Sequence, residues 1–309
     1  MRAAVIGVGH LGRHHARILA SIPGVTLVGV VDTNGERATQ VATDHGTTAY
    51  TDWRDLPGQV DAAVISVPTE AHAAVALPLV ERGVHVLVEK PLARTVAEAD
   101  ALIDAAARAG VVLAVGHSER FNPAVMAARP HVTDPRFIEV HRLGTLPDRS
   151  LDIDVVFDLM IHDLDLILNF VPSEVEAVEA VGVPVLTPRV DIANARVRFA
   201  NGCIANLTAS RISREPVRKV RFFQRDAYLS IDTAAREVEM WRLLPQAVGV
   251  PKISGGKLEV PANEPLRSEL EDFLSAVRDR RPPAVTGHQG RAALALAARI
   301  VELMDRHGH

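Results

Sequence analysis

The sequence has 309 residues, and its 48% of hydrophobic residues provide cores for about two domains, which excludes a disordered or fibrous protein. Its 34 Lys and Arg nearly balance its 38 Asp and Glu, giving a formal net charge of −4, and aromatic residues make up only 4%. The chain therefore lacks the broad positive charge and stacked rings that bind nucleic acids or anionic membranes, and we expect a small-molecule partner.

The first 120 residues predict a parallel, doubly wound α/β sheet. Their short apolar runs are continuous, as is typical of strands buried on both faces, and helix-like segments lie between them. The expected strands are Ala3–Ile6, Val25–Val31, Ala62–Val67, Val84–Val88 and Val111–Val115, and the expected helices include Leu11–Ala20, Glu70–Arg82 and Thr95–Ala109. Thr95 and Glu98 have the spacing of a capping box. This succession of strands and helices defines a first domain over residues 1–120.

Beyond residue 120 the pattern predicts an α+β domain with antiparallel strands and one major helix near residues 158–170. The expected strands are Phe137–Leu143, Val190–Phe199, Cys203–Ala209, Val217–Phe223 and Tyr228–Ile231. Asn201-Gly202 joins two of these runs and is a strong signal for a tight hairpin. Two helices, at about 267–279 and 288–306, end this second domain of residues 121–309 and are candidates to pack back on the first.

Cysteine content and targeting signals predict the compartment. The single cysteine, Cys203, excludes an internal disulfide and any CxxC redox or zinc motif. The apolar run Ala3–Val8 breaks into glycines too early for a signal peptide, and the sequence has no uninterrupted run of about 18 apolar residues. We therefore expect a soluble protein of the cytoplasm.

A glycine-rich turn follows the first expected strand and opens the first helix. Its sequence, Gly7-Val8-Gly9-His10-Leu11-Gly12, has the spacing of a dinucleotide-binding turn. Gly7 permits the tight turn, Gly9 lets the backbone approach a pyrophosphate, and Gly12 lets the helix pack closely. Such a turn also uses glycine for purely conformational reasons, so the motif gains weight from its place in the fold.

Asp32 lies 20 residues beyond Gly12, at the end of the second expected strand. Its carboxylate is placed to accept hydrogen bonds from the adenosine ribose and to repel a 2′-phosphate, which favours NAD over NADP. The alternative is a simple turn residue before Asn34-Gly35. Arg37 tempers the preference, because a nearby arginine accommodates the extra phosphate of NADP.

Glu89-Lys90-Pro91 follows the expected strand Val84–Val88. Pro91 favours extended geometry at Lys90, which places this lysine at the carboxyl edge, where open α/β sheets bind ligands. A surface lysine is usually only solvated, but one fixed here is placed to touch the nicotinamide ribose and a substrate hydroxyl. Its charge would also lower the pKa of a neighbouring acid–base group.

The segment 158–169 reads as a helix with one polar and one apolar face. A helical wheel places Asp158, His162, Asp165 and Asn169 within an arc of about 60°, whereas Met160, Ile161, Leu164, Ile167 and Leu168 fill the opposite side. A solvated face is the usual explanation, yet short Asp, His and Asn side chains suit fixed geometry. The i, i+4 pair of Asp158 and His162 is suited to general acid–base work. A metal bound by His162 with Asp163 or Asp165 is a minor alternative.

These motifs, in this order along essentially the whole chain, resemble the Gfo/Idh/MocA oxidoreductases. The resemblance implies an N-terminal Rossmann domain that binds NAD or NADP, and a second domain with an open-faced, mostly antiparallel sheet that binds substrate and forms oligomers. It implies that Lys90, Asp158 and His162 are catalytic and that the Lys90–Pro91 bond is cis. The implied cofactor-binding residues are Gly7, Gly9, His10, Leu11, Gly12, Asp32, Thr33, Arg37, Val67, Pro68, Glu89 and Lys90, and no metal ligand is implied.

Three further segments resemble the branch of this family that contains UDP-N-acetylglucosamine 3-dehydrogenases; they are Gly116–Pro123, Asp158–Leu168 and Leu207–Ser213 with Arg218-Lys219. That branch makes a 3-keto sugar, which an aminotransferase converts to a diamino sugar for lipid A. Many relatives have Gly between the Asp and the His, where this chain has Leu159-Met160-Ile161, so the shape of their pocket is not transferable. The substrate-binding residues implied are Lys90, Arg120, Asn122, Asp158, His162 and Arg211, and a structural ion pair is the alternative for Arg120, Asn122 and Arg211.

The expected activity is NAD-dependent oxidation of a ring hydroxyl, at C3, of a nucleotide-linked N-acetyl sugar such as UDP-N-acetylglucosamine. His162 would accept the hydroxyl proton, Asp158 would orient the imidazole, and Lys90 would stabilise the alkoxide. Two alternatives stay open: a dehydrogenase or reductase of a free polyol or aldose such as inositol, and a non-catalytic dinucleotide-sensing regulator. Exposed apolar strands of an open-faced sheet predict a homodimer or homotetramer.

Overall fold

The computed structural model describes residues 1–307 apart from 57, 59, 146–152 and 245–251. Its residues form two compact units: Met1–Ser118 with Glu264–Leu294, and Glu119–Asn263 with Ala295–His309. The first unit therefore contains the C-terminal helix α7 (Pro265–Asp279) and the start of α8 (Gly287–His307).

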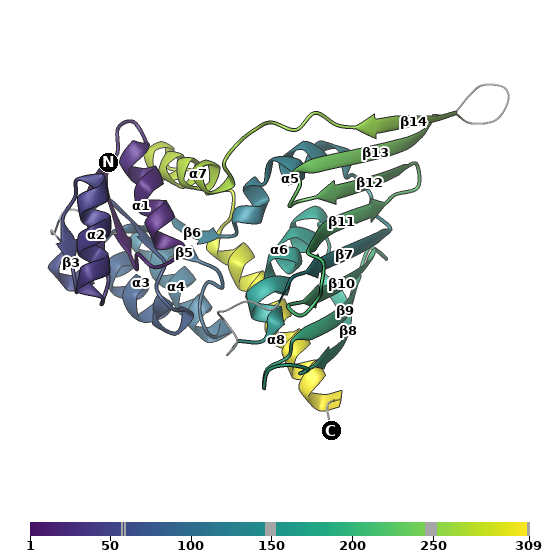
Figure 1. The fold of residues 1–309 in the computed structure, drawn as a ribbon, viewed down its shortest axis with the longest axis horizontal. Helices are drawn as coiled ribbons and strands as arrows, with labels where there is room; N and C mark the ends of the chain where they lie inside the picture. The colour runs from purple at the N-terminus through teal and green to yellow at the C-terminus, as the bar shows by residue number, and fades with distance from the viewer. Residues whose placement is uncertain (57, 59, 146–152, 245–251, 308–309) are drawn as a thin grey trace. The chain divides into compact units, whose positions relative to one another are not determined.

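The first unit is built on a six-stranded parallel sheet in the order β3-β2-β1-β4-β5-β6 (Figure 1). Its strands are β1 (Arg2–Ile6), β2 (Thr26–Val31), β3 (Ala49–Tyr50), β4 (Ala62–Ile65), β5 (His85–Glu89) and β6 (Leu113–Gly116). Its other helices are α1 (Gly12–Ser21), α2 (Gly35–His45), α3 (His72–Glu81) and α4 (Val96–Ala109). The doubly wound parallel sheet expected from the sequence is confirmed, although β4 ends two residues earlier than expected and β3 was not expected.

Burial on both faces explains why these strands are continuously apolar. All four residues of β4 are buried, and the core cluster on one face joins residues of α1, α2 and α7 to the sheet, among them Ile18, Val41 and Phe273. On α4, Thr95 and Glu98 form the expected capping box: the Thr95 side chain accepts from the Glu98 amide, and the Glu98 carboxylate accepts from the Thr95 amide.

The second unit is built on an eight-stranded sheet in the order β14-β13-β12-β11-β7-β10-β9-β8, antiparallel except for the β7–β10 pair (Figure 1). Its strands are β7 (Phe137–Leu143), β8 (Val175–Val183), β9 (Ile192–Phe199), β10 (Ile204–Ser210), β11 (Val217–Phe223), β12 (Ala227–Asp232), β13 (Glu237–Leu244) and β14 (Lys252–Lys257). Its helices are α5 (Pro123–Ala128), α6 (Ile161–Phe170) and the second part of α8. The mostly antiparallel sheet expected from the sequence is confirmed.

Asn201-Gly202 forms the predicted turn between β9 and β10. These strands pair antiparallel, and Gly202 has the positive φ of 84° that such a turn requires. The amide of Gly202 donates to the carbonyl of Phe199.

One face of the eight-stranded sheet carries side chains that are partly exposed. Asn194 bonds Thr208, Arg196 bonds Asn206, and Arg221 bonds Glu139 across the central strands. An aromatic row continues this face, since Phe223 contacts Phe137 and Tyr228, and the half-exposed Trp241 pairs with Tyr228 in register.

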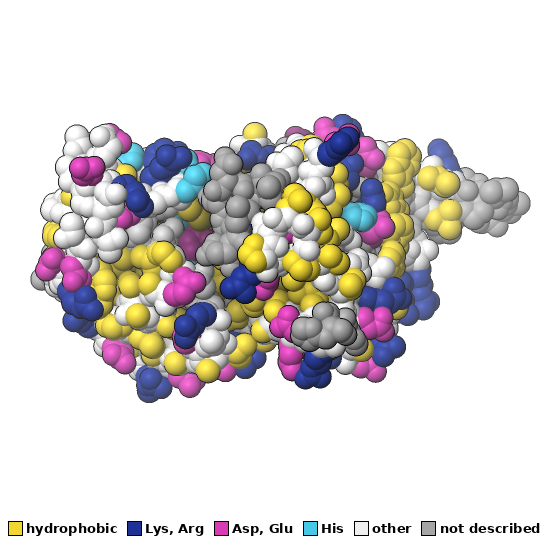
Figure 2. Space-filling model, turned by 60° about the horizontal axis from the view of Figure 1, so that its bottom comes forward, with side chains coloured by type: hydrophobic (Ala, Val, Ile, Leu, Met, Phe, Trp, Pro, Cys, Tyr) yellow, Lys and Arg dark blue, Asp and Glu magenta, His cyan; other side chains and the backbone are white. Residues whose placement is uncertain are grey.

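Figure 2 shows hydrophobic side chains gathered in a broad patch at its lower left, with acidic and basic side chains scattered around it and no large area of one charge on this face. This agrees with the small net charge of −4. Among the helices that the structure describes, none is long and apolar enough to cross a membrane.

Candidate functional site

The carboxyl edge of the six-stranded sheet gathers the predicted cofactor residues. The strand order reverses between β1 and β4, and a doubly wound sheet binds ligands beyond the carboxyl ends of its strands at such a point. Gly7 follows β1, Thr33 follows β2, Val67 and Pro68 follow β4, and Lys90 follows β5. The chain thus delivers these residues to one edge.

The three glycines differ in the space around them. A Cβ on Gly7 would lie 2.5 Å from the Ser66 carbonyl oxygen, and Gly7 has a φ of 85°. A Cβ on Gly12 would lie 1.8 Å from the Gly7 carbonyl oxygen, so both positions require glycine for packing. A Cβ on Gly9 would have space around it, since among the described residues beyond its chain neighbours its nearest atom would be Nη1 of Arg37, at 3.6 Å. Gly9 is therefore where a pyrophosphate has room to approach the backbone.

The N-terminus of α1 is suited to an anion. Within the described chain, no side chain caps this helix at Leu11, and its first turn contains no acidic residue. The positive end of the helix dipole and its amides are thus available to a phosphate. His10 and Leu11 are both exposed at this turn.

Asp32 follows β2 and lies beside the glycine-rich turn, where the adenosine ribose of a dinucleotide binds in such sheets. Its Oδ2 accepts from the Val8 amide at 3.1 Å, and its Oδ1 accepts from the Asn34 amide at 2.9 Å. Nη1 of the half-exposed Arg37 donates to Oδ2 at 3.3 Å. The carboxylate is therefore held in place beside the glycine-rich turn. The residues present fit the adenosine end of NAD.

Lys90 stands at the end of β5, and its bond to Pro91 is cis, as the resemblance implies. The buried His72 contacts the carbonyl oxygens of Pro91 and Val67, at 2.9 and 3.0 Å, and so joins the ends of β5 and β4. Burial lowers the pKa of His72, and these two carbonyl contacts oppose the shift. The segment that carries Lys90 is thus fixed from two strands.

The helix that carries His162 is less regular than expected. Residues Val156–Met160 form a π-helical turn, which contains Asp158, and α6 begins only at Ile161. Both Asp158 and His162 are half-buried. The helix expected over 158–170 is confirmed from Ile161 to Phe170, whereas its first residues belong to a π-helical turn and not to a regular α-helix. Turns of this kind are frequent at functional sites.

The predicted polar face of this helix is also wrong at Asp165. Asp165 is 1% exposed and forms a bidentate pair with Arg120, with Nε–Oδ2 at 2.6 Å and Nη2–Oδ1 at 2.8 Å. Asp163 is likewise buried and forms a bidentate pair with Arg142 of β7, with both contacts at 2.8 Å. Two arginines from other elements therefore hold α6 in place. Both oxygens of each carboxylate already bind an arginine, which does not favour the metal site considered for His162 with Asp163 or Asp165.

The three polar residues predicted as sugar or diphosphate contacts each have partners within the second unit. Arg120 is bound to Asp165, as described above. Asn122 is buried, caps α5 by accepting from the Ala124 amide, and donates to the Thr233 carbonyl. Arg211 is 1% exposed and lies 3.6 Å from the Asp191 carboxylate. These contacts favour a role inside the fold over ligand contact.

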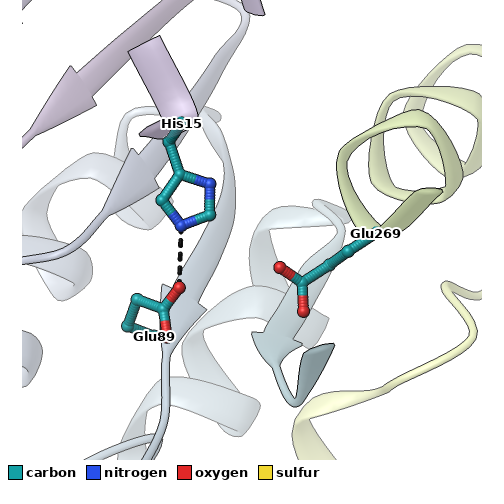
Figure 3. Close-up of side chains that lie close together, drawn as sticks. All are labelled: His15, Glu89 and Glu269. Atoms are coloured by element: carbon teal, nitrogen blue, oxygen red, sulfur yellow. Dashed lines mark hydrogen bonds and ion pairs between the residues drawn. The ribbon is translucent and has the colours of Figure 1, made fainter. Parts of the chain in front are cut away.

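Sequence reasoning missed His15, Arg142 and Glu269. Arg142 occupies an inward position of β7, in line with Ile138 and Val140, and this alternation was the available signal that it needs a buried carboxylate. His15 and Glu269 lie with Glu89 at the carboxyl edge of β5 (Figure 3), and together they are the one group with metal-ligand spacing found among the residues that the structure describes.

Comparison with known proteins agrees with this geometry. A family model described as "Oxidoreductase family, NAD-binding Rossmann fold" matches residues 1–117, and one described as "GFO/IDH/MocA C-terminal domain" matches residues 127–228. UDP-N-acetylglucosamine 3-dehydrogenase of Acidithiobacillus ferrooxidans is 42% identical over 97% of this chain and 96% of its own length.

Solved structures and more distant relatives point the same way. A crystal form of that Acidithiobacillus enzyme superposes with a TM-score of 0.93 at 41% identity, covering 99% of this chain and 98% of its own. An NAD-dependent scyllo-inositol 2-dehydrogenase of Bacillus subtilis is 26% identical over 93% of this chain and 89% of its own length. The chain therefore belongs to the Gfo/Idh/MocA family of oxidoreductases, and its first unit is an NAD-binding Rossmann domain.

Proposed function

We propose that this oxidoreductase uses NAD to oxidise the C3 hydroxyl of a nucleotide-linked N-acetyl sugar, with UDP-N-acetylglucosamine as the substrate. The observation that carries this proposal is the 42% identity, across 97% of the chain, with an enzyme of that name. The inositol dehydrogenase is more distant, at 26% identity, which favours the nucleotide sugar over a free polyol.

The proposed roles follow from the chemistry of alcohol oxidation. NAD, when bound, supplies the hydride acceptor. His162 accepts the hydroxyl proton, Asp158 orients its imidazole, and the ammonium group of Lys90 stabilises the alkoxide that develops. The contacts around Pro91 support the role of Lys90, because a charge that stabilises a transition state must be held in place before the reaction.

Substrate choice provides the test of this function. UDP-N-acetylglucosamine is expected to reduce NAD with a kcat/KM on the order of 10²-fold above that of free N-acetylglucosamine or inositol, since each charge-assisted hydrogen bond to a diphosphate contributes roughly 1.5–3 kcal/mol. NADH formation is measured with a ketone trap or a coupled aminotransferase, because oxidation of an alcohol by NAD is uphill near neutral pH. A screen in which inositol or a free aldose exceeds every nucleotide sugar would contradict the substrate and leave the family unchanged.

Cofactor choice gives a second test. NAD is expected to be preferred over NADP, and Asp32→Ser is expected to narrow the ratio of kcat/KM values by about 10- to 100-fold. The substitution removes a negative charge that would face the 2′-phosphate and leaves Arg37 available to bind it. The kinetics of both cofactors are measured for both proteins. Equal or better use of NADP by the unmutated enzyme would identify Arg37 as the dominant group.

The setting in the cell is part of the proposal. A 3-keto sugar is the substrate that an aminotransferase needs to make a diamino sugar, and we place this reaction in the cytoplasm, in the supply of lipid A. We also assign the partly exposed sheet face, with its aromatic row at Phe137, Phe223 and Tyr228, to contact with a second copy of the chain in a homodimer or homotetramer.

A further inference from the structure

Three ionisable side chains of the first unit are buried together at the carboxyl end of β5. His15 comes from α1, Glu89 ends β5, and Glu269 comes from α7 with its carboxyl group directed toward the other two (Figure 3). Their exposed fractions are 0%, 6% and 2%, and one ligand atom from each lies within 4.8 Å of the others. Gly116 on β6 makes room for them, because a Cβ there would lie 2.9 Å from the Glu89 carboxyl carbon.

The hydrogen bonds of this cluster leave one donor missing. Nε2 of His15 lies 2.7 Å from Oε1 of Glu89, and the Lys90 amide donates to Oε2 of Glu89 at 3.2 Å. If Glu89 is ionised, Nε2 is the donor and Nδ1 of a neutral His15 is left as an acceptor. Among the described residues, neither Nδ1 of His15 nor either carboxyl oxygen of Glu269 has a hydrogen-bond partner, and all three atoms are buried. An ionised Glu269 would add only acceptors, whereas a protonated one supplies the missing donor.

The charges around Glu269 also oppose its ionisation. Glu89 of β5 and His15 of α1 face Glu269, and Asp272 lies on the same helix as Glu269. Lys90 and His72 lie near Glu89. Burial, together with the negative charges of Glu89 and Asp272, raises the pKa of Glu269 well above its usual value.

A bound metal is the competing explanation, since one His and two Glu are suitable ligands for zinc. Two ligands of a tetrahedral zinc, each about 2.0–2.1 Å from the metal, stand about 3.3 Å apart. His15 and Glu89 are 2.7 Å apart, which is the distance of a hydrogen bond. The geometry therefore favours a proton over a metal.

We propose that Glu269 is a neutral carboxylic acid in the folded enzyme and donates its proton to Nδ1 of His15, so that Glu89 is the single anion behind Lys90. One ligand atom of each of the three residues lies within 4.8 Å of the others, and the proposed bond requires a rotation of the Glu269 side chain or one bridging water between its carboxyl group and Nδ1. In this arrangement Glu269 is a positioning residue: it fixes the tautomer of His15, which fixes the Glu89 carboxylate that holds the Lys90 amide. The consequence for catalysis rests on the role proposed above for Lys90.

The dependence of stability on pH tests this protonation directly. An acid whose pKa is raised in the folded state stabilises the protein below its unfolded pKa of about 4.3, and that stability is lost as the pH rises toward the folded pKa. Glu269→Gln keeps a donor and has no proton to lose. Its folding equilibrium constant is expected to rise relative to that of the unmutated protein by about tenfold per pH unit above roughly pH 5. Denaturant unfolding across pH measures this ratio.

A matched control and a spectroscopic arm make the result decisive. Glu271→Gln removes the same charge from an exposed position of α7 and is expected to give a ratio that does not vary with pH. Infrared spectra of the unmutated enzyme should retain the carbonyl band of a buried protonated acid at neutral pH, even if the variant folds poorly. A ratio for Glu269→Gln that is flat with pH would overturn the proposal. So would stoichiometric zinc in the purified enzyme that is lost in this variant.

Kinetics separate positioning from simple packing. Glu269→Leu, which has no donor, is expected to lower kcat by about 10- to 100-fold through displacement of Lys90, and Glu269→Gln is expected to restore most of it. If the stability of Glu269→Gln depends on pH as expected but Glu269→Leu keeps its kcat, then Glu269 is a neutral acid that does not position Lys90 for catalysis. Equal kcat losses for the Leu and Gln variants would instead overturn the hydrogen-bond role of Glu269.

Discussion

Replacing His162 with alanine is expected to lower kcat by about 10²–10⁴, the usual contribution of general acid–base assistance. Without the imidazole, the hydroxyl proton must leave to water while the hydride departs. The affinity for NAD should stay nearly unchanged, because His162 belongs to the second unit whereas the glycine-rich turn and Asp32 belong to the first. Steady-state NADH formation gives kcat, and a fluorescence titration gives the Kd of NAD.

Two further variants test whether a loss of kcat in His162→Ala is due to the lost proton acceptor. Asp158→Asn is expected to lose less activity than His162→Ala, since Asp158 orients the ring and does not itself take the proton. His288→Ala removes an exposed histidine at the start of α8 and should leave kcat as it is. Near-normal turnover of His162→Ala would mean that this position on α6 has no catalytic role.

The elements that the sequence predicted best are those with a strong local pattern. Phe137–Leu143 and Val217–Phe223 were predicted with the bounds of β7 and β11, because both are short runs rich in β-branched and aromatic residues. β14 has no such pattern, since Lys252–Lys257 contains one large apolar residue and two glycines. It exists through pairing with β13, a long-range contact that a local pattern does not contain.

The candidate site divides in the same way. The glycine-rich turn and Asp32 were predictable because short motifs with a fixed mechanism determine them, whereas the cis bond before Pro91 was implied only by the family resemblance. The environment of α6 was not. A wheel assigns Asp163 and Asp165 to faces by angle alone, but Arg120 and Arg142 decide their burial, and these arginines are 45 and 21 residues away. The π-helical turn at Asp158 further breaks the constant angle that the wheel assumes.

The burial of the Arg142–Asp163 pair predicts a large effect on stability. Their side chains are 5% and 3% exposed, and Glu119 adds a third contact at 3.5 Å. Burial by itself would lower the pKa of Arg142, but the carboxylates of Asp163 and Glu119 outweigh it and raise the pKa above its usual value. Because an arginine side chain is not deprotonated in proteins, the guanidinium stays charged when Asp163 is removed. This charge is what makes the loss of one partner costly.

Asp163→Ala is therefore expected to lower the free energy of unfolding by about 3–5 kcal/mol, because it leaves a buried arginine without its bidentate partner. The double variant Arg142→Met with Asp163→Leu should lose less stability than the sum of the losses of Arg142→Met alone and Asp163→Leu alone, since both charges are then removed together.

Denaturant unfolding of the unmutated protein, these two single variants and the double variant gives the coupling energy of the pair. Glu271→Ala breaks an exposed pair with Arg267 and should cost less than about 1 kcal/mol. If Asp163→Ala also lost less than about 1 kcal/mol, water would reach the buried pair, and α6 would be held in place by its apolar contacts alone.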